Sequence, residues 1–555
     1  MGEGATRGMG ALAKAALLLA LAAALSAQQT HNAYVGSKAC YGCHTAIFRS
    51  FQNTDMGRSM SPASEWTPAS LPPDASLSQP GSTRTFSVSH TDSGWQQSEA
   101  EPGEFSVDYP LAYTVGSGVN GLTFLVRRGS FLFQAPISYY SHAKKWEFSP
   151  GYEQVDLGFS RRVPEECINC HAGRPAPLAS MPGAYADPAF QELAIGCENC
   201  HGPGEAHVAS LGKLAGSILN PQKISNRLAE NICMNCHQQG DSRVLQPGKS
   251  YADFRPGQWL FDTAVIVKQP LHSSEQREQD LLEHYAAMQA SRCFRASNGK
   301  LGCLTCHDPH TQPRGDEVAG YYRAKCLTCH NEQSCPLPLK VRAAQVPADN
   351  CAGCHMPKRS IEQISHSALT NHRIPAREGE PVPALAQDEV DGLIVVNAPP
   401  GRPVKLAKVT LLKAYDELAL KNPDYQRRAS ELLDNLSKTQ PDDPFVQASL
   451  GHKAFSEEHM EQAAVHLKLA IPLGNAAVYL ELGQALAKLG RGEESIEYLK
   501  KGIELDPYNA VIQKTLILQY INAKSYADAK VLMEQYVATF PEDSLMRNLL
   551  ARVSR

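Results

Sequence analysis

A five-residue pattern, Cys-x-x-Cys-His, occurs seven times in this chain of 555 residues. Fourteen of the sixteen cysteines lie inside these copies. This placement commits nearly all the cysteine to one kind of chemistry, and it constrains the fold more than any other feature. The copies span Cys40–His44, Cys167–His171, Cys197–His201, Cys233–His237, Cys303–His307, Cys326–His330 and Cys351–His355.

The spacing matches the covalent attachment of c-type haem. Two thiols separated by two residues reach the two vinyl groups of one porphyrin edge, and the following histidine reaches the iron. Zinc ribbons use two Cys-x-x-Cys pairs per site, so an odd number of pairs, each followed by histidine, does not fit zinc. A disulfide framework would have to break up these close pairs. The sequence therefore predicts seven covalently bound haem c groups.

In this interpretation the paired cysteines hold the porphyrins and the motif histidines are the proximal iron ligands. The cysteines are Cys40, Cys43, Cys167, Cys170, Cys197, Cys200, Cys233, Cys236, Cys303, Cys306, Cys326, Cys329, Cys351 and Cys354. The histidines are His44, His171, His201, His237, His307, His330 and His355.

Residues 1–27 have the pattern of a secretory signal peptide. Arg7 and Lys14 are followed by an apolar run of Ala and Leu that ends at Leu25, and small residues come next. The run is too short to span a bilayer in the mature protein, and a retained N-terminal anchor is the alternative. Because c-type haem is attached outside the cytoplasm, we expect an exported protein, periplasmic or at the cell surface, with no membrane span in the mature chain.

Changes in composition divide the mature chain into a haem domain (28–374), a Pro-rich linker (375–403) and a C-terminal domain (404–555). Residues 82–163 alternate with period two, which predicts a small antiparallel β segment. Six motifs crowd into residues 167–355, which leaves little chain for an apolar core, so we expect the haems to form it. The predicted fold is mainly α: a haem-cored multihaem cytochrome c domain with a small β segment, followed by an α-solenoid.

The C-terminal domain repeats small and apolar residues at a spacing of 34, as Ala529 and Pro541 follow Ser495 and Pro507. This pattern resembles the tetratricopeptide repeat family, whose concave face usually binds a partner protein. The alternative is that these helices only pack on the haem domain.

The sixth ligand of each iron separates an electron-transfer haem from one that binds substrate. Outside the motifs and the repeats, nine histidines are available, and the sequence around six of them favours iron ligation. Two follow turns after a motif, two flank an acidic stretch before the fifth motif, and two follow the last motif. The six are His207, His310, His272, His284, His366 and His372.

Three segments, CysGluAsnCysHisGlyProGlyGluAlaHis, CysLeuThrCysHisAspProHis and CysHisMetPro…AsnHisArgIlePro, resemble the cytochrome c554-type multihaem superfamily. That group includes pentahaem nitrite reductases, octahaem hydroxylamine oxidoreductases and fusions of a haem domain to tetratricopeptide repeats. The resemblance implies that His207 and His310 are distal ligands. Superfamily members often have a ligating histidine where this chain has Met56. Met56 is therefore either a thioether ligand, which raises the haem potential, or a residue packed on the porphyrin.

The two cysteines outside the motifs leave a second choice open. Cys293 lies before the fifth motif, again where the superfamily pattern has a histidine, and Cys335 follows the sixth. A Cys293–Cys335 disulfide suits an exported protein, and a thiolate ligand at Cys293 is the alternative.

The leading functional hypothesis is an electron-transfer protein with mostly bis-His haems, whose repeats dock a protein partner. Its partners would be redox proteins, and no residue set identifies a catalytic site. One alternative is a multihaem oxidoreductase that acts on a small nitrogen or sulfur oxyanion at one open haem. Another is a redox-sensing tetratricopeptide scaffold. The net charge of −4 and the lack of a basic stripe exclude nucleic acid as the expected partner.

Overall fold

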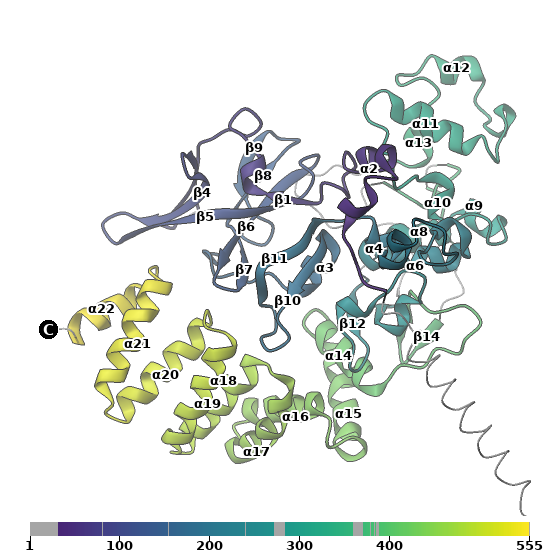
Figure 1. Cartoon of the computed structure of the whole chain (residues 1–555). Helices are drawn as coiled ribbons and strands as arrows, with labels where there is room; N and C mark the ends of the chain where they lie inside the picture. The colour runs from purple at the N-terminus through teal and green to yellow at the C-terminus, as the bar shows by residue number, and fades with distance from the viewer. Residues whose placement is uncertain are drawn as a thin grey trace, which may run out of the picture.

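The computed structural model describes residues 32–553, except 80, 154, 239, 271–282, 359–369, 378, 382 and 384–387. Figure 1 shows a β-rich region, a region of short helices and an arc of longer C-terminal helices. The signal peptide predicted at 1–27, His272 and His366 lie outside the described residues. Within the described ranges, no helix is long and apolar enough to cross a bilayer.

A nine-stranded antiparallel sheet follows the first motif, with strand order β2-β3-β4-β5-β6-β8-β9. In addition, β1 pairs with β5 and β7 pairs with β6. The strands are β1 (Met60–Pro62), β2 (Ala75–Ser78), β3 (Thr85–Thr91), β4 (Gly94–Glu101), β5 (Phe105–Val115), β6 (Gly121–Arg128), β7 (Phe131–Gln134), β8 (Ile137–Tyr140) and β9 (Lys145–Phe148).

This sheet shows that the expectation of a mainly α, haem-cored fold with a small β segment is wrong. The sheet has its own apolar core, in which Phe86 and Phe124 are buried. The sequence pattern underestimated this sheet because the buried face of β4 carries the polar residues Gln97 and Glu99 and therefore does not read as apolar. The Gln97 side chain is hydrogen-bonded inside the core: it donates to the Ile137 carbonyl (2.7 Å) and accepts from the Ile137 N–H (3.0 Å). An ordinary side-chain core therefore organises this part of the chain.

The motifs after the sheet lie on helices of only one to three turns, interrupted by short sheets. The strands are β10 (Ala172–Pro177), β11 (Tyr185–Ala194), β12 (Ser242–Leu245) and β13 (Ala264–Lys268). The helices, with those that flank the first motif, are η1 (Ser37–Cys40), α2 (Thr45–Phe51), η2 (Ala63–Glu65), α3 (Glu165–His171), α4 (Glu198–His201), α5 (Glu205–Ala209), η3 (Pro221–Lys223), α6 (Asn226–His237), η4 (Tyr251–Asp253), η5 (Leu260–Asp262), α8 (His284–Ala290), α9 (Arg292–Ala296), α10 (Cys303–Cys306), α11 (Glu317–Cys326), η6 (Glu332–Ser334), α12 (Leu339–Ala343) and α13 (Cys351–His355).

The stretch predicted to be a linker, 375–403, contains a hairpin of β14 (Asp388–Val390) and β15 (Leu393–Val395). β15 pairs with β13, so the hairpin extends the β12–β13 pair to a four-stranded sheet. Leu393 and Val395 are buried in a core shared with the first two helices of the C-terminal arc. The hairpin thereby connects the motif region firmly to the helices that follow.

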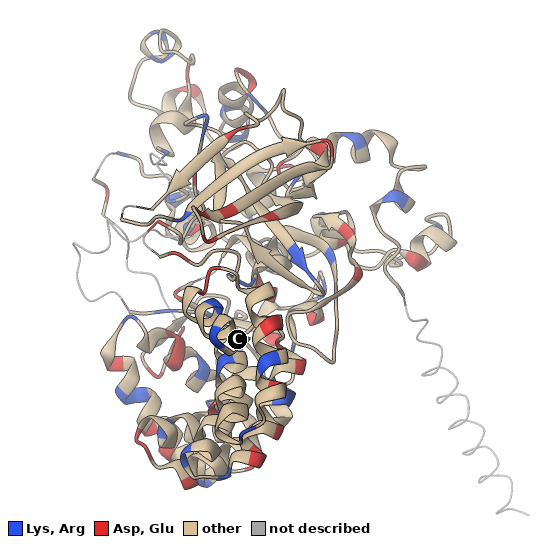
Figure 2. Ribbon diagram, turned by 90° about the vertical axis from the view of Figure 1, so that its left-hand side faces the viewer, with Lys and Arg blue, Asp and Glu red and all other residues tan. Residues whose placement is uncertain are grey.

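The C-terminal arc consists of antiparallel helix pairs. Two of these pairs approach closely at a glycine: a Cβ on Gly451 would lie 2.6 Å from Leu467, and one on Gly483 would lie 2.6 Å from Leu499. The helices are α14 (Lys408–Ala419), α15 (Pro423–Thr439), α16 (Pro444–Ser456), α17 (Met460–Ala470), η7 (Ile471–Leu473), α18 (Ala476–Lys488), α19 (Gly492–Leu505), α20 (Ala510–Asn522), α21 (Tyr526–Thr539) and α22 (Ser544–Val553). Figure 2 shows basic and acidic residues interspersed over these helices.

The far end of the arc contacts the region of the nine-stranded sheet through ion pairs. Arg162 lies 2.9 Å from Asp506, and Arg547 on α22 lies 2.6 Å from Glu104 at the β4–β5 turn. Both ends of the arc are therefore attached to the rest of the chain. One end is held by an apolar core, and the other is held by this contact between the sheet and the last helices, which we call the seam.

Candidate haem-binding site

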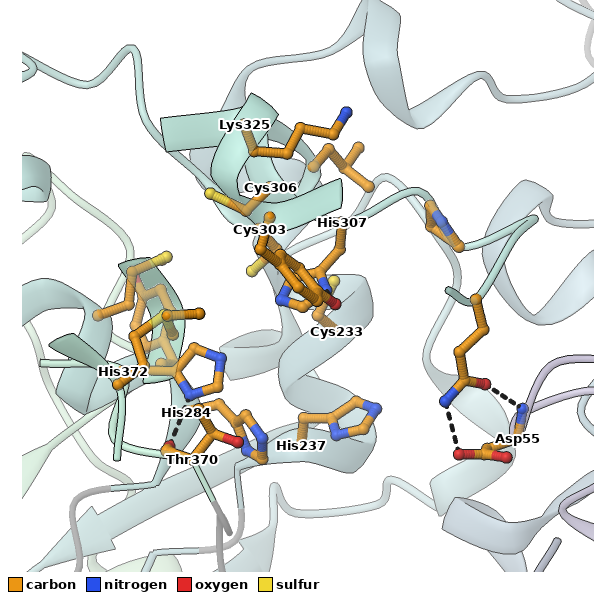
Figure 3. A pocket seen from close by; sticks show the side chains of 18 of the residues that line it. Asp55, Cys233, His237, His284, Cys303, Cys306, His307, Lys325, Thr370 and His372 are labelled. Carbon is orange, nitrogen blue, oxygen red and sulfur yellow. Dashed lines mark hydrogen bonds between the residues drawn. The ribbon is translucent and has the colours of Figure 1, made fainter. Parts of the chain in front are cut away.

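A large cavity, about 2650 Å³ in volume, runs through the motif region. Pockets for one small molecule have about 300–1,000 Å³, so this cavity has room for several cofactors. Its walls include cysteines or histidines of the second to seventh motifs. Figure 3 shows part of it, where His237, His284, His307 and His372 project toward one another.

Two pairs of histidine rings are spaced for one iron each. The ring centres of His44 and His207 lie 6.3 Å apart with an interplanar angle of 18°. Those of His201 and His310 lie 6.0 Å apart at 12°. Metal–imidazole bonds of about 2 Å place the two ring centres of a bis-imidazole site about 6 Å apart. The first and third motifs therefore each face a distal histidine that the sequence predicted as a ligand.

A buried carboxylate holds the first of these pairs together. Glu198, inside the third motif, is 1% exposed, and it accepts hydrogen bonds from the N–H groups of Val35 (3.0 Å), Gly36 (2.7 Å) and Gly204 (2.7 Å). The Ser37 hydroxyl accepts from the Cys197 N–H at 2.8 Å. These bonds fix the chain before the first motif onto the third, beside the turn that carries His207.

A second set of contacts positions the turn after the fifth motif. The Asp308 carboxylate accepts from the His310 N–H (3.0 Å) and lies 3.3 Å from its Nδ1. Further along, Gln312 donates to the Asp55 carboxylate at 2.7 Å and accepts from the Asp55 N–H at 2.8 Å. Arg314 adds an ion pair of 2.8 Å to Asp55. The turn is thus connected to the loop after the first motif while His310 faces His201.

The fourth and fifth motifs share a cluster of four histidines. The ring centres of His237 and His284 are 5.5 Å apart, those of His307 and His372 are 6.2 Å apart, and those of His284 and His372 are 4.6 Å apart. The first two distances suit one iron each. Burial lowers the pKa of His284 to about 3 and that of His307 to about 4. Both imidazoles are therefore neutral at pH 7, which is the form that binds a metal.

Backbone carbonyls select the metal-binding nitrogen of three ligands. Nδ1 of His201 lies 2.7 Å from the Leu219 carbonyl, and Nδ1 of His355 lies 2.8 Å from that of Pro375. Nδ1 of His372 likewise lies 2.9 Å from the Thr370 carbonyl. An Nδ1–H that donates to a carbonyl leaves Nε2 free to bind a metal. The residues present therefore fit haem iron in their spacing, protonation and tautomer.

The odd-numbered motifs follow a simple rule. The loop after the third motif brings His207 to His44, the loop after the fifth brings His310 to His201, and the chain after the seventh brings His372 to His307. Each of these segments therefore supplies a facing histidine to the preceding odd-numbered motif and not to the motif that it follows.

Met56 and the two cysteines outside the motifs were also candidate residues. Met56 lies beside the second motif: the Ser59 N–H donates to the Met56 carbonyl (3.1 Å), and the Ser59 hydroxyl donates to the His171 carbonyl (2.7 Å). Met56 and His171 also line the same cavity. Cys293 and Cys335 are free thiols in this structure.

The motif helices contact one another in an order that differs from the chain order. α3 packs on α6, α6 on α10, α10 on α11 and α11 on α13, which connects motifs two, four, five, six and seven. The Cys170 thiol donates to the Asn235 carbonyl at 3.6 Å, so the second motif touches the fourth. The thiols of Cys40 and Cys197 interact, and Cys200 packs in the cluster around the fourth motif. All seven motifs therefore form one continuous network.

Thiols and histidines spaced for iron, together with the C-terminal helix pairs, define a c-type cytochrome with an attached helical repeat region. Comparison with known families agrees. The model of the family described as cytochrome c554 and c-prime matches residues 137–202, which include the second and third motifs. A tetratricopeptide repeat model matches residues 476–509. These matches confirm the predicted resemblance, and the cytochrome c554 match implies covalently bound haem c.

No curated protein matches this sequence. Among solved structures, the APC/C hetero-tetramer Cut9-Hcn1 is 24% identical over 27% of this chain and 30% of its own, with a TM-score of 0.24. The Arabidopsis OM64 TPR domain is 17% identical over 20% of this chain and 93% of its own, with a TM-score of 0.19. YrrB, described as a TPR protein with an unusual peptide-binding site, is 17% identical over 26% of this chain and 72% of its own, with a TM-score of 0.23. This chain thus spans less than a third of the length of the Cut9-Hcn1 chain that it matches.

Replacing His207 by alanine is expected to convert one haem from low spin to high spin, because His207 is the ring that faces His44. Electron paramagnetic resonance of the oxidised protein measures this as a new high-spin signal equivalent to one haem. His452→Ala, at an exposed histidine on α16, is the matched control and should leave the spectrum unchanged. An unchanged His207→Ala spectrum would remove His207 from the ligand set.

Proposed function

We propose that this protein is an exported c-type cytochrome with seven haems that carries electrons along a chain of mostly bis-His haems. The observation that carries the proposal is the continuous network of motif helices, in which four motif histidines face a second histidine. Bound haem c supplies a reversible one-electron couple at its iron. The facing histidine pairs would hold the haem iron with two imidazoles, and such ligation would favour electron transfer over substrate binding.

The order of motif contacts supports a route through the protein. The first motif touches the third, the third adjoins the fourth, and the fourth leads through the fifth and sixth to the seventh. The second motif touches the fourth and forms a branch. The thiols of Cys233 and Cys303, on the fourth and fifth motifs, interact directly. In this proposal the chain spaces its haems closely enough for rapid electron transfer from one end of the network to the other.

The repeat region supports a second part of the proposal, the docking of a protein partner. Tetratricopeptide repeats are protein interaction modules. Both ends of the arc are anchored, so its middle helices α16–α18 remain the part available to a partner.

Intact mass and visible spectroscopy of the purified protein test the proposal together. We expect seven haems per chain and a ferric spectrum dominated by low-spin iron, with stepwise reduction by dithionite. A double Cys326→Ser and Cys329→Ser variant should lose one haem and serves as the calibration. A count below seven in the wild type, or a dominant high-spin signal, contradicts the proposal. Fractionation of the expressing cells tests export separately.

A further inference from the structure

The nine-stranded sheet forms one wall of the cavity that holds the motif cysteines. Thr123 and Leu125 on β6 line this cavity, whereas Leu122 and Phe124 on the same strand lie in the apolar core of the sheet. Successive side chains of a strand point to opposite faces, so the two faces of β6 meet different surroundings. One face belongs to the sheet core, and the other is open to the cavity.

The second motif lies against this wall. Leu125 shares an apolar cluster with Ile168, which lies between the two cysteines of the motif. At the other end of the motif, the Ser59 hydroxyl, just before β1, donates to the His171 carbonyl at 2.7 Å. Both ends of the second motif are therefore attached to the sheet, and the motif lines the cavity together with the sheet wall.

Gln134 and Arg161 lie side by side on the same wall. Leu125 pairs with Gln134 on β7. Beyond β7 the pairing continues, because Phe133 forms an antiparallel bridge with Arg162 and the Gln134 N–H donates to the Arg161 carbonyl at 2.9 Å. Residues directly opposite each other in antiparallel strands have their side chains on one face. Gln134 and Arg161 are such neighbours, and both line the cavity.

The Arg161 guanidinium is held in place by the chain around it. It donates to the Pro150 carbonyl and lies 5.6 Å from the ring centre of Tyr152. Gly151 has a φ of 90°, and a Cβ there would lie 2.5 Å from Nη1 of Arg161, so glycine is needed for this close approach. Within the described ranges, the hydrogen bonds of Gln134 use its backbone alone, which leaves its side-chain amide free to donate.

Within the described residues, Arg161 forms no ion pair, and its hydrogen bond goes to a carbonyl. Two carboxylates of the same region have other partners. Glu153 accepts from the Gly151 N–H at 2.8 Å. Burial raises the pKa of Glu166, and the cation that opposes this rise is Arg243. The charge of Arg161 is therefore left for a group that occupies the cavity.

Bound haem would exclude water from this part of the cavity, and an enclosed cation is costly without an anion beside it. We propose that Arg161 and Gln134 form a binding site for a carboxylate or a small oxyanion next to the second motif. Arg161 supplies the charge and a fork of donors, and Gln134 adds an amide donor. The proposal rests on the proposed function, because it takes the second motif to hold haem.

Two sources supply such an anion, and Arg161→Gln separates them. One source is a propionate of the second haem. Loss of its counter-charge should lower the midpoint potential of one haem by about tenfold in the reduction equilibrium, about 59 mV. It should also shift the propionate bending band of one haem in the resonance Raman spectrum. The other source is a free oxyanion, which the variant should bind at least about tenfold more weakly.

Potentiometric titration, resonance Raman spectroscopy and calorimetry with sodium nitrate and sodium phosphate measure these effects on the haem-loaded protein. Gln134→Glu, which places a negative charge in the site, should act in the same direction as Arg161→Gln. Arg161→Lys keeps the charge and should recover most of the wild-type behaviour. Arg127→Gln is the matched control, because Arg127 lies on β6, outside the cavity wall, and pairs with Asp187 at 2.7 Å. It should have no effect.

A propionate band shift with the lower potential, or weaker oxyanion binding, supports the site and identifies its source. A lower potential with neither of the other changes reflects charge alone and overturns the proposal, as does an equal effect of Arg127→Gln. If Arg161→Gln does not fold, Gln134→Glu and Arg161→Lys decide. If the wild type holds seven haems that dithionite reduces and no variant differs from it, only the anion site is wrong. A wild type without haem on the second motif contradicts the proposed function instead.

Discussion

Glu198→Ala is expected to lower the free energy of unfolding by about 3–5 kcal/mol and to detach the first motif from the third. The Glu198 carboxylate is buried and accepts from three backbone N–H groups, and each such group left without an acceptor costs about 1–3 kcal/mol. Loss of these bonds frees the chain before Cys40, so His207 no longer faces His44. Urea unfolding measures the first effect. Electron paramagnetic resonance measures the second, as one haem that leaves the low-spin state.

Glu205→Ala is the matched control, because Glu205 lies nearby but, among the described residues, its carboxylate accepts a single exposed hydrogen bond, from the Ala33 N–H at 3.0 Å. It should cost less than about 1 kcal/mol and leave the haem spectrum intact. Glu198→Gln should fall between the two, since an amide keeps one acceptor oxygen. If Glu198→Ala stays within 1 kcal/mol of the wild type with all haems low spin, Glu198 does not hold the first motif.

Local sequence predicted candidate ligands but not which motif each one faces. The motifs indicate the proximal histidines by spacing alone, and the turns after the third and fifth motifs indicate His207 and His310, whose rings face His44 and His201 in the structure. Which motif each one faces depends on contacts between distant segments. The bond from Val35 to Glu198 joins residues 163 apart. No local pattern reports such a bond, so the motif that each distal candidate faces could not be predicted from the sequence.

The β structure was underestimated for a related reason. Sequence periodicity detects strands that bury apolar residues, but β4 buries Gln97, which donates to Ile137 on β8, and Glu99, which lies beside Arg84 just before β3. The β14–β15 hairpin lies among prolines and was read as a linker, although Leu393 and Val395 fill a core. In both places the deciding interactions come from outside the segment.

Glu99 also connects the sheet to the repeat region. It is 1% exposed and lies 3.1 Å from Arg84, which pairs with Asp156 at 3.0 Å. Across the seam lies Glu542, in the turn between α21 and α22. Burial, with a smaller contribution from Glu542, raises the pKa of Glu99 from its ordinary value of 4.5 to about 8. Burial raises the pKa of Glu542 as well.

Arg128 holds the same seam from the sheet side. Its guanidinium lies 4.7 Å from the ring centre of Tyr508 and donates to the Thr539 carbonyl at 2.6 Å. Arg128 and Arg84 are the cations that oppose the rise in the pKa of Glu99. Because burial outweighs them, the seam binds a proton more tightly when folded than when unfolded.

Stability should therefore fall as pH rises from about 4.5 to about 8. In this window the folded protein keeps a proton on Glu99 that the unfolded chain has already released, and above it the ionised carboxylate must be buried. A shift of this size corresponds to about 3–5 kcal/mol. Glu99→Gln, which cannot ionise, should remove most of this loss, while Arg84 keeps its pair with Asp156.

Urea midpoints at pH 5 and pH 9 measure this difference. The wild type should lose stability between the two, and Glu99→Gln should lose much less. The same change at the exposed Glu65 leaves the seam intact and should reproduce the wild-type slope. A Glu99→Gln protein with an undiminished slope would show that the pH dependence arises elsewhere. A flattened slope would show that this one buried carboxyl accounts for most of the loss of stability at high pH.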